Sequence, residues 1–159
     1  MSGRFFPRFS GPFFTLVLIS LPFASLMMAQ QTVSEADTRD RGLVADSFVK
    51  QRLAVWQERL SLQDWRISIV MSHPGDLKPK TLGNIHWDAT NKTAVIRVLD
   101  ASDYRMNLQD MLDDMEFTVV HELIHLELSS LPRSEASRRD EEHAVNQLAD
   151  ALLKLDRKR

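Results

Sequence analysis

Two histidines lie four residues apart in the segment FTVVHELIHLEL, residues 117–128, and a glutamate directly follows the first histidine. Residues at positions i and i+4 of a helix project from one face, so His121 and His125 can direct ring nitrogens at a single ion. Glu122 projects about 100° further round the helix, where its carboxylate can reach a water molecule on that ion without binding the ion itself. The spacing predicts a divalent-metal site with a carboxylate base beside it.

Composition limits the ligands that such a site can use. The chain has no cysteine, which excludes disulfides, thiolate ligands and cysteine nucleophiles, and leaves His, Asp and Glu for a metal. Its 159 residues, 43% hydrophobic and 26% charged, predict one globular domain. A formal net charge of -2 provides no basic field for phosphate, so we expect no nucleic-acid partner.

The N-terminal segment predicts export. Arg4 and Arg8 precede an apolar run that ends at Ala29, and polar residues follow at once. This order is typical of a secretory signal peptide, so we expect residues 1–29 to be removed and the mature protein to be secreted or periplasmic, without a stable membrane span. An uncleaved anchor is the alternative, because a run of about 17 apolar residues is at the lower limit for crossing a bilayer.

The elements that must position the site lie in residues 43–159. Residues 30–42 contain few large apolar side chains, which predicts a flexible spacer. After Asp46, apolar residues recur at helical spacing from Val49 to Leu60, and this pattern predicts a first helix.

Three strands are expected between this helix and the metal motif. Residues 65–71 alternate apolar and polar side chains and end before a His-Pro-Gly breaker. Residues 82–88 and 93–100 flank a short turn, and Ala94, Ile96 and Val98 share one face of the second segment. These two segments predict a hairpin.

Two further helices are expected. Asn107 is a suitable N-cap for a motif helix that runs to about Ser130, with three acidic residues on a solvated face, Asp113, Asp114 and Glu116. Beyond Pro132, a last amphipathic helix has an apolar stripe of Val145, Leu148, Leu152 and Leu155. The predicted fold class is α+β, with a small, mainly antiparallel sheet of about three strands packed on an N-terminal helix, the motif helix and a C-terminal helix.

A zinc site with this motif needs a third protein ligand and an open position for water. Outside the motif helix, the side chains that could serve are His73, His86, Glu141, Glu142 and His143.

The HELIH segment has the H-E-x-x-H pattern of zinc metallopeptidases, and the segment EEHAVNQLADALL begins 16 residues after His125. Together these segments resemble a minimal gluzincin, a member of the zincin metallopeptidases. In gluzincins a glutamate on a following helix completes the metal site, and a carboxylate or amide one turn later supports a ligating histidine. The resemblance implies Glu142 as the third Zn²⁺ ligand and Asn146 as the supporting residue, with Glu141 or His143 as alternative ligands.

The same resemblance implies a zincin-like fold and a zinc-dependent peptidase. Zinc would polarise the scissile carbonyl and lower the pKa of its bound water toward about 7, and Glu122 would act as the general base. A peptide or protein substrate would bind in extended form along an edge strand at residues 84–88. The side chains that could stabilise the oxyanion are Tyr104, His86 and His143.

Two other functions fit the same residues. One is a zinc-stabilised binding module without catalysis, because so short a domain has no room for the second subdomain of larger gluzincins. The other is a zinc amidase that acts on a cell-wall amide or another amide. Two imidazoles and one carboxylate also accept divalent metals other than zinc.

Overall fold

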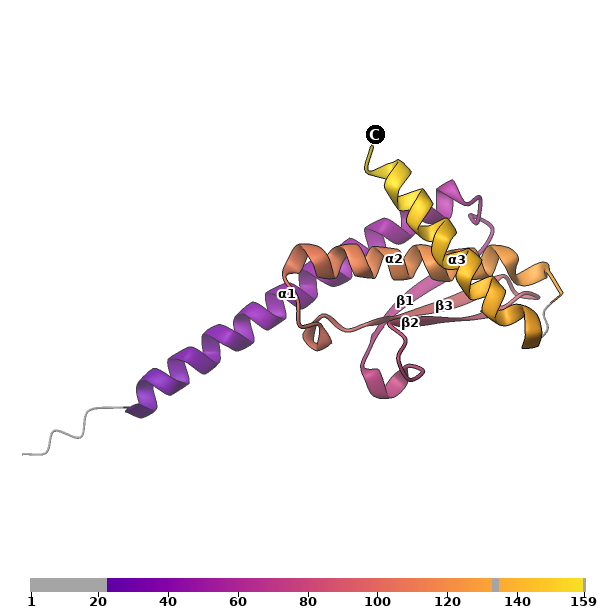
Figure 1. Ribbon diagram of the computed structural model, residues 1–159. Helices are drawn as coiled ribbons and strands as arrows, with labels where there is room; N and C mark the ends of the chain where they lie inside the picture. Colours follow the sequence, from indigo (N-terminus) through magenta and orange to yellow (C-terminus); the bar gives the residue numbers. More distant parts are fainter. Residues whose placement is uncertain (1–22, 133–134, 159) are drawn as a thin grey trace, which may run out of the picture.

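The computed structural model describes residues 23–132 and 135–158 (Figure 1). The helices and strands follow the order α1 (Phe23–Arg59), β1 (Arg66–Ser72), β2 (Gly83–Asp88), β3 (Thr93–Leu99), α2 (Leu108–Glu127) and α3 (Glu135–Asp156). Short 3₁₀ turns lie at Pro74–Asp76, Ala101–Asp103 and Leu128–Ser130. The α+β class and the three-stranded sheet expected from the sequence are confirmed.

The sheet has the strand order β1-β3-β2 and is mixed. β2 and β3 form the expected antiparallel hairpin, with Ile85 opposite Ile96. β1 pairs with β3 in parallel, so the expectation of a mainly antiparallel sheet is wrong for this strand. The reason is the connection at residues 73–82: it carries the chain to the far edge as β2, and β3 then returns through the middle, parallel to β1.

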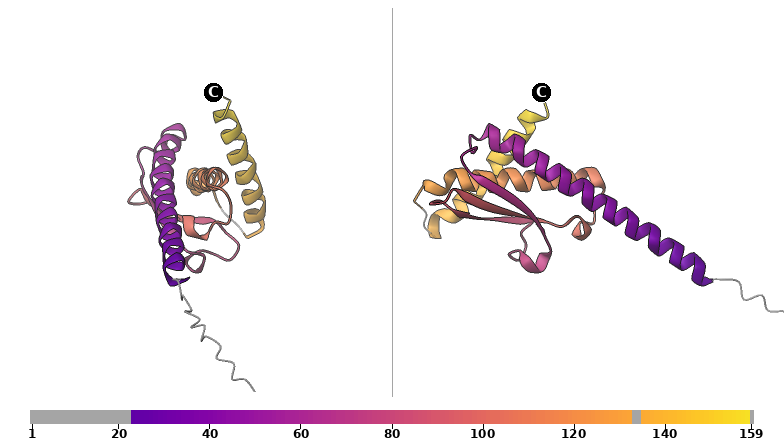
Figure 2. Two further views of the ribbon diagram at one scale, coloured as in Figure 1. Left: turned by 90° about the vertical axis from the view of Figure 1, so that its left-hand side faces the viewer. Right: turned by 180° about the vertical axis from the view of Figure 1, so that it is seen from behind.

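The core lies between one face of the sheet and α2. Ala94, Ile96 and Val98 are buried on that face, as their alternation predicts. α2 packs on β2 and β3, and Figure 2 shows α2 between α1 and α3. α2 therefore has neighbours on several sides, which explains why most of its length is buried.

Local signals define where α2 begins and ends. The side chain of Asn107 accepts a hydrogen bond from the backbone N–H of Asp110 at 2.9 Å, which confirms the predicted N-cap. The helix ends at Glu127, and the 3₁₀ turn that follows ends at Ser130. Glu116 is only 6% exposed, so its predicted place on a solvated face is wrong.

α1 is longer than its apolar stripe. The first helix is confirmed, and Val49, Leu53 and Trp56 of its apolar stripe are buried in the core. The helix also includes residues 30–42, where the sequence predicts a flexible spacer, and its N-terminal part extends away from the rest of the domain (Figure 1). This stretch has no proline, and its only glycine is Gly42, so the packed helix can continue toward the N-terminus.

The predicted signal peptide lies largely outside the described residues, because residues 1–22 are not described and only residues 23–29 belong to α1. Within residues 23–132 and 135–158, no helix is long and apolar enough to cross a membrane.

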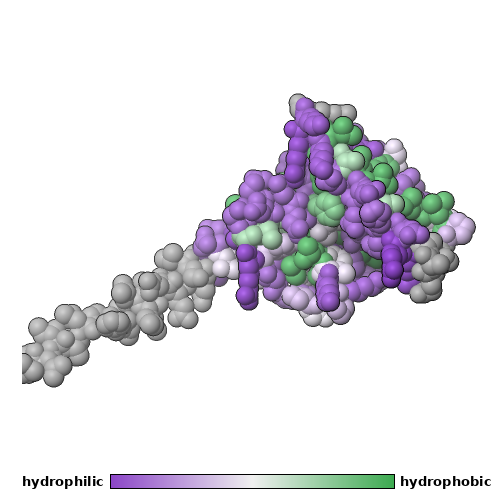
Figure 3. Space-filling view, in the orientation of Figure 1, coloured by the Kyte–Doolittle hydropathy of each residue, from purple (hydrophilic) through white to green (hydrophobic). Residues whose placement is uncertain are grey.

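α3 packs through a row of residues spaced by four. Val145, Ala149 and Leu153 are buried, whereas Leu148 is 48% and Leu155 is 62% exposed. The predicted stripe is thus wrong at Leu148 and Leu155, because α3 lies on α2 along the i+4 row and these two side chains point away from that row. Figure 3 shows the resulting apolar surface along α3.

Candidate metal centre

α2 places both motif histidines on one face, one turn apart. The Nε2 atoms of His121 and His125 lie 3.1 Å apart, and the ring centroids are separated by 4.7 Å. His125 is 9% exposed, and the side chain of His121 is 15% exposed. Burial and the neighbouring His125 lower the pKa of His121, which favours the neutral imidazole that binds metal.

α3 brings Glu142 to the same point. Its Oε2 lies 3.5 Å from Nε2 of His121, and its Oε1 lies 3.3 Å from Nε2 of His125. The ligand atoms of the three residues all lie within 4.8 Å of one another. The structure therefore brings together the three side chains that the sequence predicts as ligands, in a donor set that suits Zn²⁺.

The other ring nitrogen of each histidine is held from α3. Nδ1 of His121 lies 3.1 Å from Oδ1 of Asn146, and Nδ1 of His125 lies 3.0 Å from Oε1 of Glu141. When each Nδ1–H donates to its oxygen, the lone pair of Nε2 faces the shared point. Asn146 thus occupies the supporting place that the resemblance implies, and Glu141 contacts Nδ1 of His125.

The buried row of α3 explains why Glu141 and Glu142, although neighbours in the sequence, contact the histidines in different ways. Glu141 precedes Val145 by four residues and so continues the buried row, which turns its carboxylate inward against His125. Glu142 is one position further round the helix, and its side chain is 57% exposed at the mouth of the site. Asn146 follows Glu142 by one turn and reaches His121 from the same side.

Glu122 lies beside the cluster and beside β2. It is 7% exposed, and burial, followed by the negative charge of Glu142, raises the pKa of Glu122 to about 7, while Lys78 opposes this rise. A Cβ atom at Gly83 would lie 3.6 Å from Oε1 of Glu122 but only 2.7 Å from the backbone oxygen of Arg97, and closer still to Cγ2 of Thr118. Only glycine lets β2 approach α2 this closely.

A cavity of about 600 Å³ opens over the cluster, between β2, α2 and α3. The side chains of His121, Glu122, His125 and Glu142 line it. Its other lining residues include three large apolar side chains and three cations, Ile85, Trp87, Phe117, Lys78, Lys80 and Arg138. A ligand in this cavity would contact an apolar wall, a cationic wall and the histidine–glutamate cluster.

The three residues predicted to stabilise an oxyanion do not line this cavity. Tyr104 is buried and donates its hydroxyl hydrogen to Oδ2 of Asp114 at 2.8 Å. His86 is exposed and accepts a hydrogen bond from Arg97 at 3.4 Å, and His143 is exposed on α3. The sequence pattern contains no signal for the cations that do line the cavity, because Lys78 and Lys80 belong to a connecting loop.

His73, another residue that could have completed the site, lies in a separate exposed group with Asp100 and Asp103. Its Nδ1 lies 2.7 Å from Oδ2 of Asp103, and this contact raises the pKa of His73. Its imidazole is therefore engaged away from the motif histidines.

Comparisons with protein-family models, with curated proteins and with solved structures found no match for this chain. The motif spacing and the geometry of the cluster are therefore the observations from which a function can be inferred.

Proposed function

We propose that this protein is a zinc-dependent peptidase of the zincin type, with His121, His125 and Glu142 as metal ligands and Glu122 as the general base. One observation carries the proposal: two histidine Nε2 atoms and a carboxylate face one point, next to a buried glutamate in an open cavity. The H-E-x-x-H spacing supports the same division of roles.

The donor set fits zinc. Two neutral imidazoles and one carboxylate are a common ligand set of catalytic zinc, and an oxygen acceptor lies beside each Nδ1. Bound there, Zn²⁺ would polarise a carbonyl group and lower the pKa of a water molecule toward about 7. Three protein ligands beside an open cavity support a catalytic site, because structural zinc sites are closed by four.

Glu122 supplies the proton transfers. Its carboxylate accepts a proton from the attacking water and passes it to the departing amine. Glu122 is buried beside the cluster, where its carboxylate can accept a proton from water and release it to a leaving group. Glu122 is not one of the proposed metal ligands, so its substitution should leave metal binding intact.

The sheet supports binding of an extended peptide. β2 is an edge strand, paired with β3 on one side only, and its residues Gly83, Ile85 and Trp87 line the cavity. An extended substrate can add to such an edge through backbone hydrogen bonds. The apolar wall formed by Ile85, Trp87 and Phe117 then offers a surface for a substrate side chain.

The test compares Glu122→Gln with the parent. We expect one equivalent of zinc in both by elemental analysis, and hydrolysis of a broad peptide library that falls by roughly 10² to 10⁴ in the variant. Glu127→Gln is the matched control, because Glu127 is an exposed residue of the same helix that does not line the cavity.

His121→Ala should lose both zinc and hydrolysis. A folded parent without zinc, or undiminished hydrolysis by Glu122→Gln, would refute the proposal. Glu122-dependent cleavage of cell-wall fragments without cleavage of peptides would instead identify an amidase.

A further inference from the structure

The cavity has a cationic wall at the end where the chain enters β2. We infer from this wall that the site selects substrates that carry a carboxylate on the C-terminal side of the scissile bond. The carboxylate would belong either to an acidic side chain or to the end of the substrate chain. This inference rests on the proposed peptidase function and names the substrate class of the same site.

Lys78 and Lys80 form this wall from one tight turn. The backbone N–H and the hydroxyl of Thr81 both donate to the carbonyl oxygen of Lys78, at 3.1 and 2.8 Å. Pro79 occupies the second position of this turn, which suits its restricted φ. Lys80 has a φ of 66°, in the left-handed region that glycine adopts without strain.

A lysine in this conformation suggests a role for its side chain. Lys92 also has a positive φ, of 50°, and its ammonium group lies 3.3 Å from Asp64 and 4.7 Å from the ring centroid of Trp65. Lys80 makes no such contact among the described residues, and its side chain lines the cavity. Its charge is therefore available to a ligand.

The direction of β2 determines on which side of the scissile bond the cationic wall lies. Gly83, the first residue of β2, lies next to Glu122, and the lysine turn directly precedes it. Antiparallel pairing with β2 is the more favourable arrangement. In such a pair the peptide runs in the direction opposite to β2, so its C-terminal end lies where β2 begins. Residues beyond the scissile bond then reach Lys80 and Lys78.

The other charges of the cavity strengthen this preference. Glu141 and Glu142 are directed at the two histidines, so their charge is opposed by that of a bound metal ion. Arg138 adds a third cation to the lining. A substrate carboxylate complements this field, whereas a substrate lysine would be repelled.

The test measures binding to zinc-loaded Glu122→Gln, in which turnover is suppressed. The probes are fluorescein-labelled ten-residue peptides with Phe at the centre, in pairs that carry Glu or Gln at the positions after it, each as a free acid and as an amide. We expect the Glu peptides to bind about 5- to 10-fold more tightly at low salt, and the difference to shrink at 0.5 M salt. A difference between acid and amide alone would identify the chain terminus as the source of the carboxylate.

Four lysine variants in the Glu122→Gln background make the test specific. Lys80→Gly removes the charge and suits the positive φ, so a lost preference cannot come from a damaged turn. Lys80→Arg should retain the preference, Lys78→Gln should reduce it about threefold, and Lys92→Gln, remote from the cavity, should leave it unchanged.

Equal binding of all four peptide forms, no binding of any, or an unchanged carboxylate preference in Lys80→Gly together with Lys78→Gln would overturn the inference. Hydrolysis by the parent distinguishes this failure from that of the proposed function. Cleavage without a carboxylate preference refutes only the inference. Lysine-dependent binding without any cleavage refutes the peptidase and leaves the lysine turn as a carboxylate-binding wall.

Discussion

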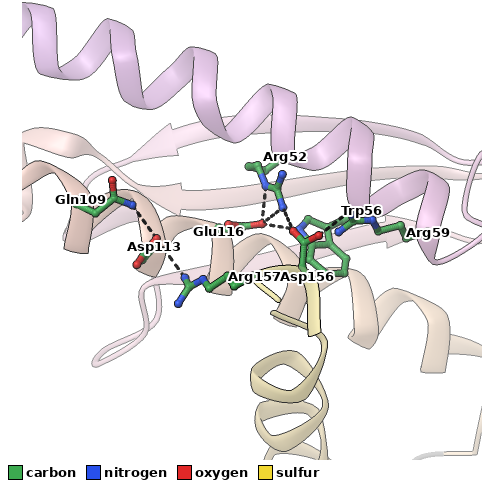
Figure 4. A network of polar contacts seen from close by, with 8 residues as sticks. All are labelled: Arg52, Trp56, Arg59, Gln109, Asp113, Glu116, Asp156 and Arg157. Carbon is green, nitrogen blue, oxygen red and sulfur yellow. Dashed lines mark hydrogen bonds and ion pairs between the residues drawn. The ribbon is translucent and has the colours of Figure 1, made fainter. Parts of the chain in front are cut away.

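Arg52 of α1 and Asp156 at the end of α3 form an ion pair, with 2.6 Å between Nη2 and Oδ2. Arg52 also binds the buried carboxylate of Glu116 on α2, which accepts a second hydrogen bond from Nε1 of Trp56 at 2.7 Å (Figure 4). The network joins all three helices. It anchors the end of α3 that lies about 20 Å along the helix from Glu142.

Removal of Glu116 should therefore destabilise the fold. In Glu116→Ala, Arg52 and the indole N–H of Trp56 lose their shared acceptor in a largely buried place, and we expect a loss of about 2 kcal/mol in the free energy of unfolding. Urea denaturation measures it. Lys50→Ala is the control, because its pair with Asp46 is exposed and should contribute about 0 to 1 kcal/mol. Equal losses in the two variants would contradict a stabilising role for the network.

Asp156 should make stability depend on pH. Its hydrogen bond with Arg59, and then that with Arg52, lower the pKa of Asp156, against the smaller opposing effect of burial. Because the pKa is lower in the folded state, this contribution is present above the unfolded value of about 4 and is lost as the pH falls through the folded value. Asp156→Asn should thus lose less stability than the parent between pH 6 and 3.

Unfolding midpoints at pH 6, 4.5 and 3 provide the measurement for Asp156. Asp150→Asn is the matched control, since Asp150 pairs with Lys154 on an exposed face of the same helix. If the midpoint changed equally with pH in the parent and in Asp156→Asn, the pH dependence of stability would not come from Asp156.

Gly83→Ala should disturb the packing of β2 against β3 and α2. The new Cβ would lie 2.7 Å from the backbone oxygen of Arg97, which cannot move aside as a flexible side chain could. We expect a loss of about 1 to 3 kcal/mol in stability and reduced turnover. Gly75→Ala has no atom within 4 Å of its Cβ and should change stability by less than about 0.5 kcal/mol. Thermal unfolding of both variants is the check, and similar midpoints would exclude the close approach.

Ligand and supporting residues should differ in their effect on metal affinity. Glu141→Ala and Asn146→Ala remove the oxygen acceptors beside the Nδ1 atoms but no proposed metal ligand, so we expect affinity to fall about 10- to 100-fold while saturating zinc still gives one equivalent. Glu142→Ala removes a proposed ligand and should weaken zinc binding more. Competition with a chelator measures the zinc affinity of all three variants. A larger loss of affinity in Glu141→Ala than in Glu142→Ala would make Glu141 the ligand in place of Glu142.

Short-range patterns in the sequence were sufficient to predict the features of this protein that depend on local contacts. The i, i+4 spacing places His121 and His125 on one face of any helix, and Asn107 caps that helix through a bond to Asp110. The hairpin and the stripe of α1 follow from periodicity in the same way. Each of these features depends on neighbours within a few residues along the chain.

Tertiary packing decided the rest. Glu141, Glu142 and His143 follow one another at about 100° steps round a helix, and only the docking of Val145 and Ala149 on α2 determines which of them faces the histidines. The order of the strands, the burial of Glu116 and the position of the Lys78–Lys80 turn beside the cavity likewise depend on contacts between distant segments. Sequence periodicity describes the faces of single elements, and it contains no information about how two such faces are brought together.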